Sequence, residues 1–391
     1  MTVTSPRGFR AAGVAAGLKP GPALDVALVL NDGPDATAAG VFTANRVKAA
    51  PVLWSQRVLR GGVLRAVVLN SGGANACTGP QGFQDTHATA EHTAAALRGP
   101  GVKRMMFGAG EVAVCSTGLI GERLPMDRLL PGVSAAVRGL ARDGGGDAAQ
   151  AIMTTDTRPK TTAIAGHGWS VGGMAKGAGM LAPALATMLC VLTTDAVAGS
   201  AALDEALREA CRLTFDRLDS DGCMSTNDTV LLMASGASGI EPTPEELTGA
   251  VTAACHDLAR QLLADAEGAT KQIAIEVVGA RDEDEAVTAG RAVARNSLVK
   301  AALFGNDPNW GRILAAVGTT DAAFEADAVD VAVNGVWVCR SGAAAEDRSK
   351  VDLTGPAVTI TIDLNAGPAE ATVWTNDLSP AYVHENSAYS T

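Results

Sequence analysis

The sequence predicts an α/β or α+β fold, because segments with strand-like and helical patterns alternate along the chain. A helix is predicted to begin after Thr243, a good N-cap residue, with Pro244 in the first helical position and Glu246 in the third. Apolar residues then recur at helical spacing, at Leu247, Val251, Leu258 and Leu262. Alternating Ile and Val residues at 273–277 predict a strand, and a compact apolar run at 188–193 predicts a buried one.

The remaining elements follow the same logic. Short Val/Leu/Ala runs within 24–41 and 62–70 end in Gly, Asn or Asp, as strands closed by turns do. The Ala-rich segment 86–97 and the periodic segment 285–303 are each predicted to be helical. The three glycines 144–146 interrupt a helical pattern and are predicted to form a surface turn.

Composition restricts the function. The chain has 391 residues, 47% of them hydrophobic and 19% charged, which suits a globular protein with one large domain or two ordinary ones. Its formal net charge is -11, and its Lys and Arg residues form no cluster. Nucleic acids are bound through a basic face, so we expect no nucleic-acid partner and favour a small-molecule substrate.

Cysteine usage indicates a reducing compartment. The seven cysteines are odd in number, are irregularly spaced and include no C-x-x-C pair, so neither a disulfide framework nor a zinc site is expected. The five histidines show no triad or metal spacing, and we expect no metal. The apolar stretch 11–18 is too weak for a signal peptide, and no run reaches the roughly 18 apolar residues of a membrane helix. We therefore expect a cytoplasmic protein without a membrane partner.

Three interpretations compete for the stretch 176–189, which reads KGAGMLAPALATML. Its glycines loosely fit a dinucleotide-binding loop, but Pro183 interrupts any following helix and no clear βαβ unit surrounds it. A glycine-rich turn that leads into a core strand is the plain structural interpretation. The third is that Thr187, the first residue of the predicted strand, becomes an N-terminal nucleophile.

The chemistry of Thr187 permits this third interpretation. A threonine hydroxyl is a weak nucleophile at neutral pH, and a neighbouring base must take its proton during attack. A free α-amine, with a pKa of about 7.7 to 8.0, can be that base on the same residue. It becomes available only when the bond between Ala186 and Thr187 is cut, for example by attack of the Thr187 hydroxyl on the Ala186 carbonyl and hydrolysis of the resulting ester.

The stretch 176–189, followed by Thr193-Thr194-Asp195, resembles the cleavage signature of the ornithine acetyltransferase family, also called glutamate N-acetyltransferases. The resemblance runs from Gly8 to the last residue. Further segments of the chain match it in order: Asn70–Gly79, Ser116–Gly121, Thr154–Thr157, Ser225–Asp228, Glu267–Lys271, Gly305–Arg312, and a tail with Asn386, Tyr389 and Thr391.

The resemblance implies a layered sheet-and-helix fold like that of self-processing aminopeptidases. It also implies a cut between Ala186 and Thr187 that leaves an α chain, 1–186, and a β chain, 187–391, within one folded unit. Thr187 would accept an acetyl group from N-acetylornithine and pass it to glutamate, in arginine biosynthesis and without a cofactor. The two chains are expected to associate as an α2β2 heterotetramer.

Roles for individual residues follow from the same resemblance. Thr117, through its hydroxyl, and Gly118, through its backbone N–H, would bind the negative oxygen of the tetrahedral intermediate. The positions that would contact substrate are Thr154, Lys176, Thr187, Glu267, Asn386 and Thr391. These residue types supply donors for a carboxylate and acceptors for amines, as amino-acid substrates require.

Several alternative functions remain open on sequence grounds. A related self-processing amidohydrolase or aminopeptidase would pass the acyl group to water. A bifunctional enzyme would also accept acetyl groups from acetyl-CoA, and a secondary-metabolism acetyltransferase would use another acceptor. An uncut chain that only binds a small molecule is the alternative from a different class.

Overall fold

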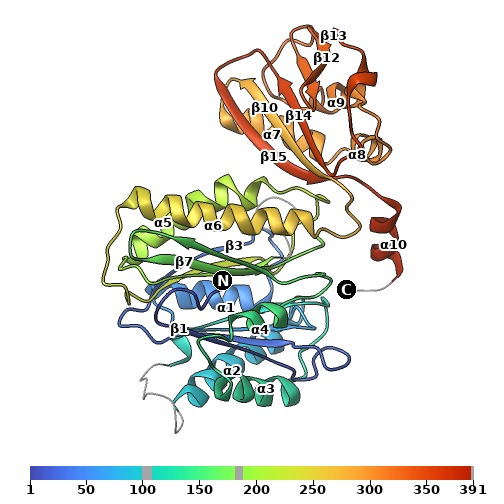
Figure 1. Ribbon diagram of the computed structural model, residues 1–391. Helices are drawn as coiled ribbons and strands as arrows, with labels where there is room; N and C mark the ends of the chain where they lie inside the picture. The colour runs from blue at the N-terminus through green and yellow to red at the C-terminus, as the bar shows by residue number, and fades with distance from the viewer. Residues whose placement is uncertain (99–107, 181–187, 389–391) are drawn as a thin grey trace.

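The computed structural model describes residues 1–98, 108–180 and 188–388. The strands of these residues form three sheets, two of them stacked between layers of helices and the third placed beyond them (Figure 1). This arrangement confirms the predicted α/β class. No helix of the described residues is long and apolar enough to cross a membrane.

The first sheet has four strands in the order β1-β2-β4-β5, of which β4 and β5 are parallel. Its strands are β1 (Phe9–Val14), β2 (Val26–Asn31), β4 (Ala66–Ser71) and β5 (Val112–Thr117). The helices that contact it are α1 (Ala50–Val58), α2 (Gly79–Leu97), α3 (Met126–Arg138) and α4 (Gly145–Ala151). The helices α2 and α3 form the outer layer on this side of the molecule (Figure 1).

The second sheet has five strands in the order β3-β9-β8-β7-β6, in which the neighbours β9 and β8 are parallel. Its strands are β3 (Thr37–Phe42), β6 (Lys160–Ala165), β7 (Ser170–Lys176), β8 (Leu189–Thr194) and β9 (Thr229–Ala234). Two helices cover its outer face, α5 (Ser200–Leu213) and α6 (Pro244–Ala264). The helix α6 begins with the predicted capping box, in which Thr243 and Glu246 satisfy each other's backbone N–H groups.

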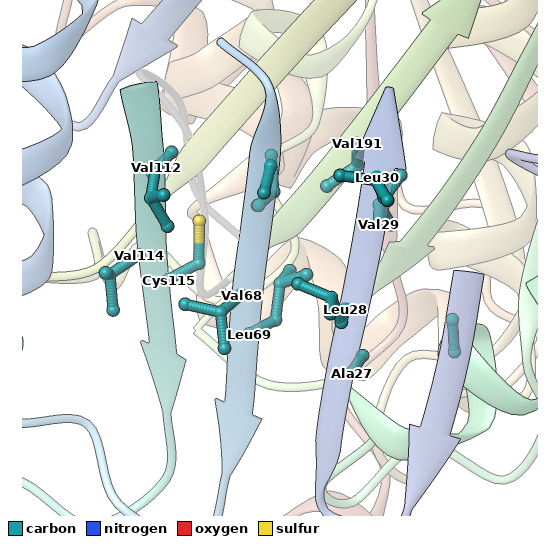
Figure 2. Packing of buried hydrophobic residues seen from close by; sticks show 14 of the residues in the cluster. Ala27, Leu28, Val29, Leu30, Val68, Leu69, Val112, Val114, Cys115 and Val191 are labelled. Atoms are coloured by element: carbon teal, nitrogen blue, oxygen red, sulfur yellow. The ribbon is translucent and has the colours of Figure 1, made fainter. Parts of the chain in front are cut away.

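The main core lies where the two sheets face each other. Strands β2, β4, β5, β8 and β9 are buried along their whole length, as their nearly continuous Val/Leu runs require. Side chains such as Leu28 and Leu69 of the first sheet share one cluster with Val191 of the second (Figure 2), and Met233 of the second sheet belongs to the same cluster. This packing fixes the ends of β5, β7 and β8 relative to one another.

A third, six-stranded sheet with its own core follows in the sequence, in the order β13-β12-β11-β14-β10-β15. Its strands are β10 (Gln272–Ala280), β11 (Asp330–Val333), β12 (Val336–Arg340), β13 (Ala343–Ala344), β14 (Ala357–Asp363) and β15 (Ala369–Asn376). Its helices are α7 (Glu283–Ala294), α8 (Ser297–Phe304) and α9 (Trp310–Val317). From β15 the chain returns toward the stacked sheets through α10 (Pro380–Ala388) (Figure 1).

Two local predictions were wrong. The glycines 144–146 do not form a surface turn, because Gly145 begins α4 and Gly144 is packed so closely that a Cβ would lie 2.0 Å from the Ala11 carbonyl oxygen. The segment 285–303 is two helices, because the side chain of Asn296 accepts the N–H groups of Leu298 and Val299 and caps a new helix.

Candidate active site

A pocket of about 600 Å³ opens where β5, β7 and the turn after α6 meet. Six residues to which the sequence assigned a role line this one pocket although they lie far apart in the chain. They are Thr117, Gly118, Thr154, Lys176, Glu267 and Asn386. Ala186, Thr187 and Thr391 lie outside the described residues.

Thr117 is the last residue of β5, and its side chain is buried. Its carbonyl accepts a hydrogen bond from the Gly73 N–H at 3.0 Å, which ties the end of β5 to the neighbouring loop. Gly118 follows with φ +127°, a conformation that L side chains rarely adopt, and a Cβ there would lie 2.5 Å from the Gly73 nitrogen. Glycine is therefore required at 118 for both reasons.

Asn227 braces the same corner from the second sheet. Its side-chain amide donates to the carbonyl of Ala74 at 2.6 Å and to that of Ser116 at 2.8 Å. Thr226 donates its hydroxyl to the Asn227 side-chain oxygen at 2.6 Å, so that every polar atom of this buried amide is used. The segment before β9 thereby fixes the loop and the strand end that carry Thr117 and Gly118.

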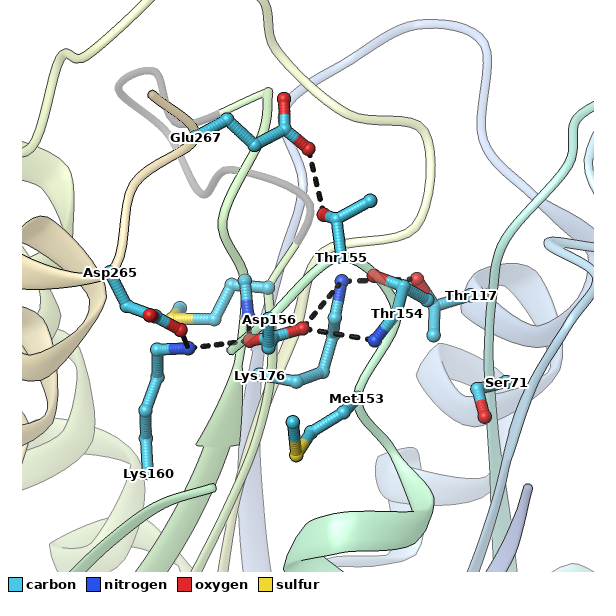
Figure 3. Close-up of polar contacts among 12 residues, drawn as sticks. Ser71, Thr117, Met153, Thr154, Thr155, Asp156, Lys160, Lys176, Asp265 and Glu267 are labelled. Atoms are coloured by element: carbon cyan, nitrogen blue, oxygen red, sulfur yellow. Dashed lines mark hydrogen bonds and ion pairs between the residues drawn. The ribbon is translucent and has the colours of Figure 1, made fainter. Parts of the chain in front are cut away.

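Lys176 ends β7 and is almost fully buried, with 2% of its side chain exposed. Its Nζ donates to the Thr117 hydroxyl oxygen at 3.5 Å and lies 3.9 Å from Oδ2 of Asp156 (Figure 3). Burial lowers the pKa of Lys176 because the charged amine is desolvated, whereas the charges of Asp156, Asp228 and Glu267 oppose this effect.

Glu267 lies in the turn after α6, where its N–H donates to the Ala178 carbonyl at 2.9 Å. The Thr155 hydroxyl donates to one carboxylate oxygen at 2.7 Å, and the Asn386 amide donates to the other at 3.0 Å. These two donors orient the carboxylate, and Figure 3 shows the contact with Thr155. A carboxylate accepts about four hydrogen bonds, so Glu267, which lines the pocket, retains capacity to accept from a ligand amine.

Residues 10–391 match the ArgJ family. The chain is 65% identical over 391 residues to the arginine biosynthesis bifunctional protein ArgJ of Thermobifida fusca, and all of both chains is covered. It is 64% identical over 390 residues to the ArgJ protein of Streptomyces avermitilis, again over all of both chains. The chain belongs to the ArgJ family. The predicted family is thus confirmed.

A solved structure, that of the ornithine acetyltransferase from Mycobacterium tuberculosis in complex with ornithine, is 67% identical in the aligned part. The alignment covers 46% of this chain and 94% of the Mycobacterium tuberculosis chain, with a TM-score of 0.45.

Sequence reasoning missed four polar residues at this ArgJ-family site. Thr155 and Asp156 lie in the segment 154–157, and Asn227 and Asp228 lie in the segment 225–228. Both segments are motifs of the family resemblance, but the sequence predicts no role for these four residues. Each of the four also has a partner more than 20 residues away, Glu267, Gly177, Ser116 and Met188 respectively, so only the motif itself could draw attention to them.

Asp228 lies beside the start of β8 in this ArgJ-family chain. Its Oδ1 accepts the Met188 N–H at 3.0 Å, and Met188 is the residue after Thr187 in the sequence. Burial raises the pKa of Asp228 well above its usual value, because the charged carboxylate is desolvated. In the described residues, no group of three His, Cys, Asp or Glu side chains is placed to hold a metal ion.

Proposed function

We propose that this chain transfers an acetyl group from N-acetylornithine to glutamate, in two half-reactions that share an acetyl ester on Thr187. The observation that carries the proposal is the convergence of Thr117, Gly118, Lys176 and Glu267 on one pocket in a chain of the ArgJ family. No cofactor takes part in the proposed reaction, since both half-reactions are acyl transfers between nucleophiles.

The donors for the oxyanion are the Thr117 hydroxyl and the Gly118 N–H. Lys176 donates its Nζ–H to the Thr117 oxygen, so the hydroxyl hydrogen of Thr117 is free to point at another acceptor. A negative oxygen on the former acetyl carbonyl is that acceptor in the tetrahedral intermediate. Losing one such donor commonly lowers the rate by about 100- to 1000-fold.

Amino-acid recognition is assigned to Glu267, Lys176 and Thr154, which line the same pocket. Glu267, oriented by Thr155 and Asn386, accepts hydrogen bonds from the amine of the bound amino acid. Lys176 and Thr154 supply positive charge and donors for its carboxylate. Ornithine and glutamate share this amine and carboxylate, which allows both to occupy one site in turn.

Thr187 becomes a nucleophile only after the proposed cut that separates an α chain, 1–186, from a β chain, 187–391. Met188 is held by Asp228, and Lys176 is paired with Leu189 across β7 and β8. Met188, the first described residue after the cut, is therefore anchored next to the end of β7, where Lys176 lines the pocket. The new α-amine of Thr187 takes the proton of its own hydroxyl during attack.

The test is the intact mass of the purified protein before and after exposure to N-acetylornithine without glutamate. We expect two chains that end and begin at 186 and 187, with one acetyl group gained by the C-terminal chain and lost again when glutamate is added. Thr187→Ala should remain one folded chain that gains no acetyl group. Acetyl transfer by that variant contradicts the proposal.

The same experiment separates the alternatives. Release of acetate in the absence of glutamate indicates a hydrolase, and one uncut, unmodified wild-type chain indicates a small-molecule binder. Acetylation of the C-terminal chain by acetyl-CoA, in place of N-acetylornithine, would establish the bifunctional activity.

Assembly and location complete the proposal. We expect two α and two β chains in one particle, which light scattering coupled to size exclusion can weigh. All seven cysteines are free thiols in the structure, as suits a reducing cytoplasm.

A further inference from the structure

A chain of buried charges, Asp265, Lys160 and Asp156, leads to Lys176 in the proposed substrate pocket (Figure 3). Lys160, the first residue of β6, is completely buried. Its Nζ donates to Asp156 Oδ1 at 2.6 Å and to Asp265 Oδ2 at 2.5 Å. Lys160 does not line the pocket, so substrate contact does not account for its burial.

Asp156 holds the neighbourhood of Lys176 at three points. Its Oδ1 accepts the N–H of Gly177, the residue after Lys176, at 2.7 Å. Its Oδ2 accepts the N–H of Thr154 at 3.0 Å and lies 3.9 Å from the Lys176 Nζ. One carboxylate therefore contacts the backbone of two pocket segments and pairs with the lysine between them.

We propose that Asp156, itself held by Lys160, is a positioning residue that directs the Lys176 ammonium at the Thr117 hydroxyl, and that Lys160 limits how strongly Asp156 stabilises the Lys176 charge. The inference deepens the proposed function and rests on it for its catalytic consequence. The effect of Asp156 and Lys160 on the charge of Lys176 can be measured without the acetyl-transfer reaction, and all three residues belong to the part of the chain that the structure describes.

The charges that act on Lys176 have opposing signs. Desolvation lowers its pKa, the negative charges of Asp156, Asp228 and Glu267 raise it, and the positive charge of Lys160 lowers it. On Asp156 burial alone would raise the pKa, but the two lysines and the Gly177 N–H outweigh burial and lower the pKa to about 2. Asp156 is thus ionised at any working pH.

Stability alone is a poor explanation for this arrangement. Buried ion pairs cost desolvation energy that their attraction often fails to recover, and well-packed apolar replacements are frequently as stable. The cluster also lies where its field acts on Lys176. A third lysine, Lys19, also interacts electrostatically with the Asp156 carboxylate. Its Nζ donates to the Met153 carbonyl at 3.0 Å.

The experiment is an NMR titration of the lysine side chains, labelled with ¹³C at Cε. The sequence has eight lysines, and the resonance of Lys176 is identified by its absence from Lys176→Arg. Asp156→Asn should lower the pKa of Lys176 by about one unit or more, since a unit charge about 4 Å away is removed. Lys160→Met should move it in the opposite direction.

A matched control distinguishes this effect from the loss of any buried lysine. Lys271 is also buried, and its Nζ donates to the carbonyl of Leu353 at 2.6 Å. Lys271→Met should leave the pKa of Lys176 unchanged. If Lys160→Met does not fold, the double variant Lys160→Met/Asp265→Asn replaces it, because it removes one positive and one negative charge together.

The two single variants decide the inference by the signs of their shifts. Shifts of opposite sign support it, whereas shifts of the same sign, or none beyond the Lys271→Met control, overturn it. The alkaline limb of the pH profile of kcat/KM should move in the same two directions. A wild-type protein that transfers no acetyl group refutes the proposed function, and the NMR signs still decide the charge relation between Asp156, Lys160 and Lys176.

Discussion

Gly118→Ala tests the proposed oxyanion site most sharply, because the structure specifies what the added methyl group would meet. A Cβ at 118 would lie 2.5 Å from the Gly73 nitrogen and 2.8 Å from the Gly72 carbonyl carbon. Real Cβ atoms do not approach another heavy atom more closely than 3.0 Å, so the backbone at 73 or 118 must move by about 0.5 Å. That movement breaks the contact between Gly73 and the Thr117 carbonyl that holds the end of β5.

The expected result is a selective loss of turnover. Displacing an oxyanion donor lowers kcat by about 100- to 1000-fold, equivalent to about 2.7 to 4 kcal/mol of transition-state stabilisation. Ground-state binding of N-acetylornithine, measured by calorimetry, should change far less, because the oxyanion exists only after attack. Kinetic assays with varied N-acetylornithine and glutamate measure kcat and KM separately.

Gly121→Ala is the matched control. Gly121 also has a positive φ, +89°, but nothing lies within 4 Å of the Cβ position. Both variants pay backbone strain of about 1 to 3 kcal/mol, visible as a lower melting temperature, but only the substitution at 118 displaces the loop. A kcat of Gly118→Ala within tenfold of wild type, or an equal loss in Gly121→Ala, would refute the reasoning.

In Gly268→Ala, the added Cβ would lie 2.2 Å from the Tyr382 nitrogen and push α10 off the pocket. We expect KM to rise about tenfold, which corresponds to the loss of roughly one hydrogen bond. Unchanged steady-state kinetics would contradict this prediction. Burial raises the pKa of Asp219 to about 6. Between about pH 4 and 6 the native state therefore binds this proton more tightly than the unfolded state does, and the protein loses stability as the pH rises through that window. Asp219→Asn should therefore gain about 2.4 kcal/mol relative to wild type between pH 4 and pH 7 in urea unfolding, and a pH-independent difference would contradict the assignment. Native protein should react with a thiol reagent at the exposed Cys77 and Cys223 and, only after unfolding, at the five buried cysteines; seven rapid thiols in the native state would contradict the structure.

Patterns with a local cause were predictable from the sequence. The capped helix that begins after Thr243 and the alternating strand at 273–277 were correct, since both depend on neighbouring residues. The break at Asn296 was missed because apolar residues keep their helical spacing across it. The family and six pocket residues were found through motifs, which record the site without describing its geometry.

The charge cluster behind the pocket could not be predicted. Lys160 and Asp265 are 105 positions apart, and in sequence each resembles an ordinary solvated charge. The packing of α6 on β6 and β7 brings them together, because Lys160 begins β6 and Asp265 directly follows α6. Long-range sheet order of this kind depends on the competition between many possible pairings, which no single segment encodes.

The order of strands in the five-stranded sheet determines what a nick between β7 and β8 can do. Strands β3, β7 and β6 precede that point in the chain and β8 and β9 follow it, yet the sheet order β3-β9-β8-β7-β6 seats the later pair between the earlier ones. Two sets of strand-to-strand hydrogen bonds within this sheet, between β3 and β9 and between β7 and β8, join the earlier part of the chain to the later part. The fragments would separate only by global unfolding, so a severed molecule should elute as one particle, and fragments produced in separate cells should not reassemble without being unfolded and refolded together.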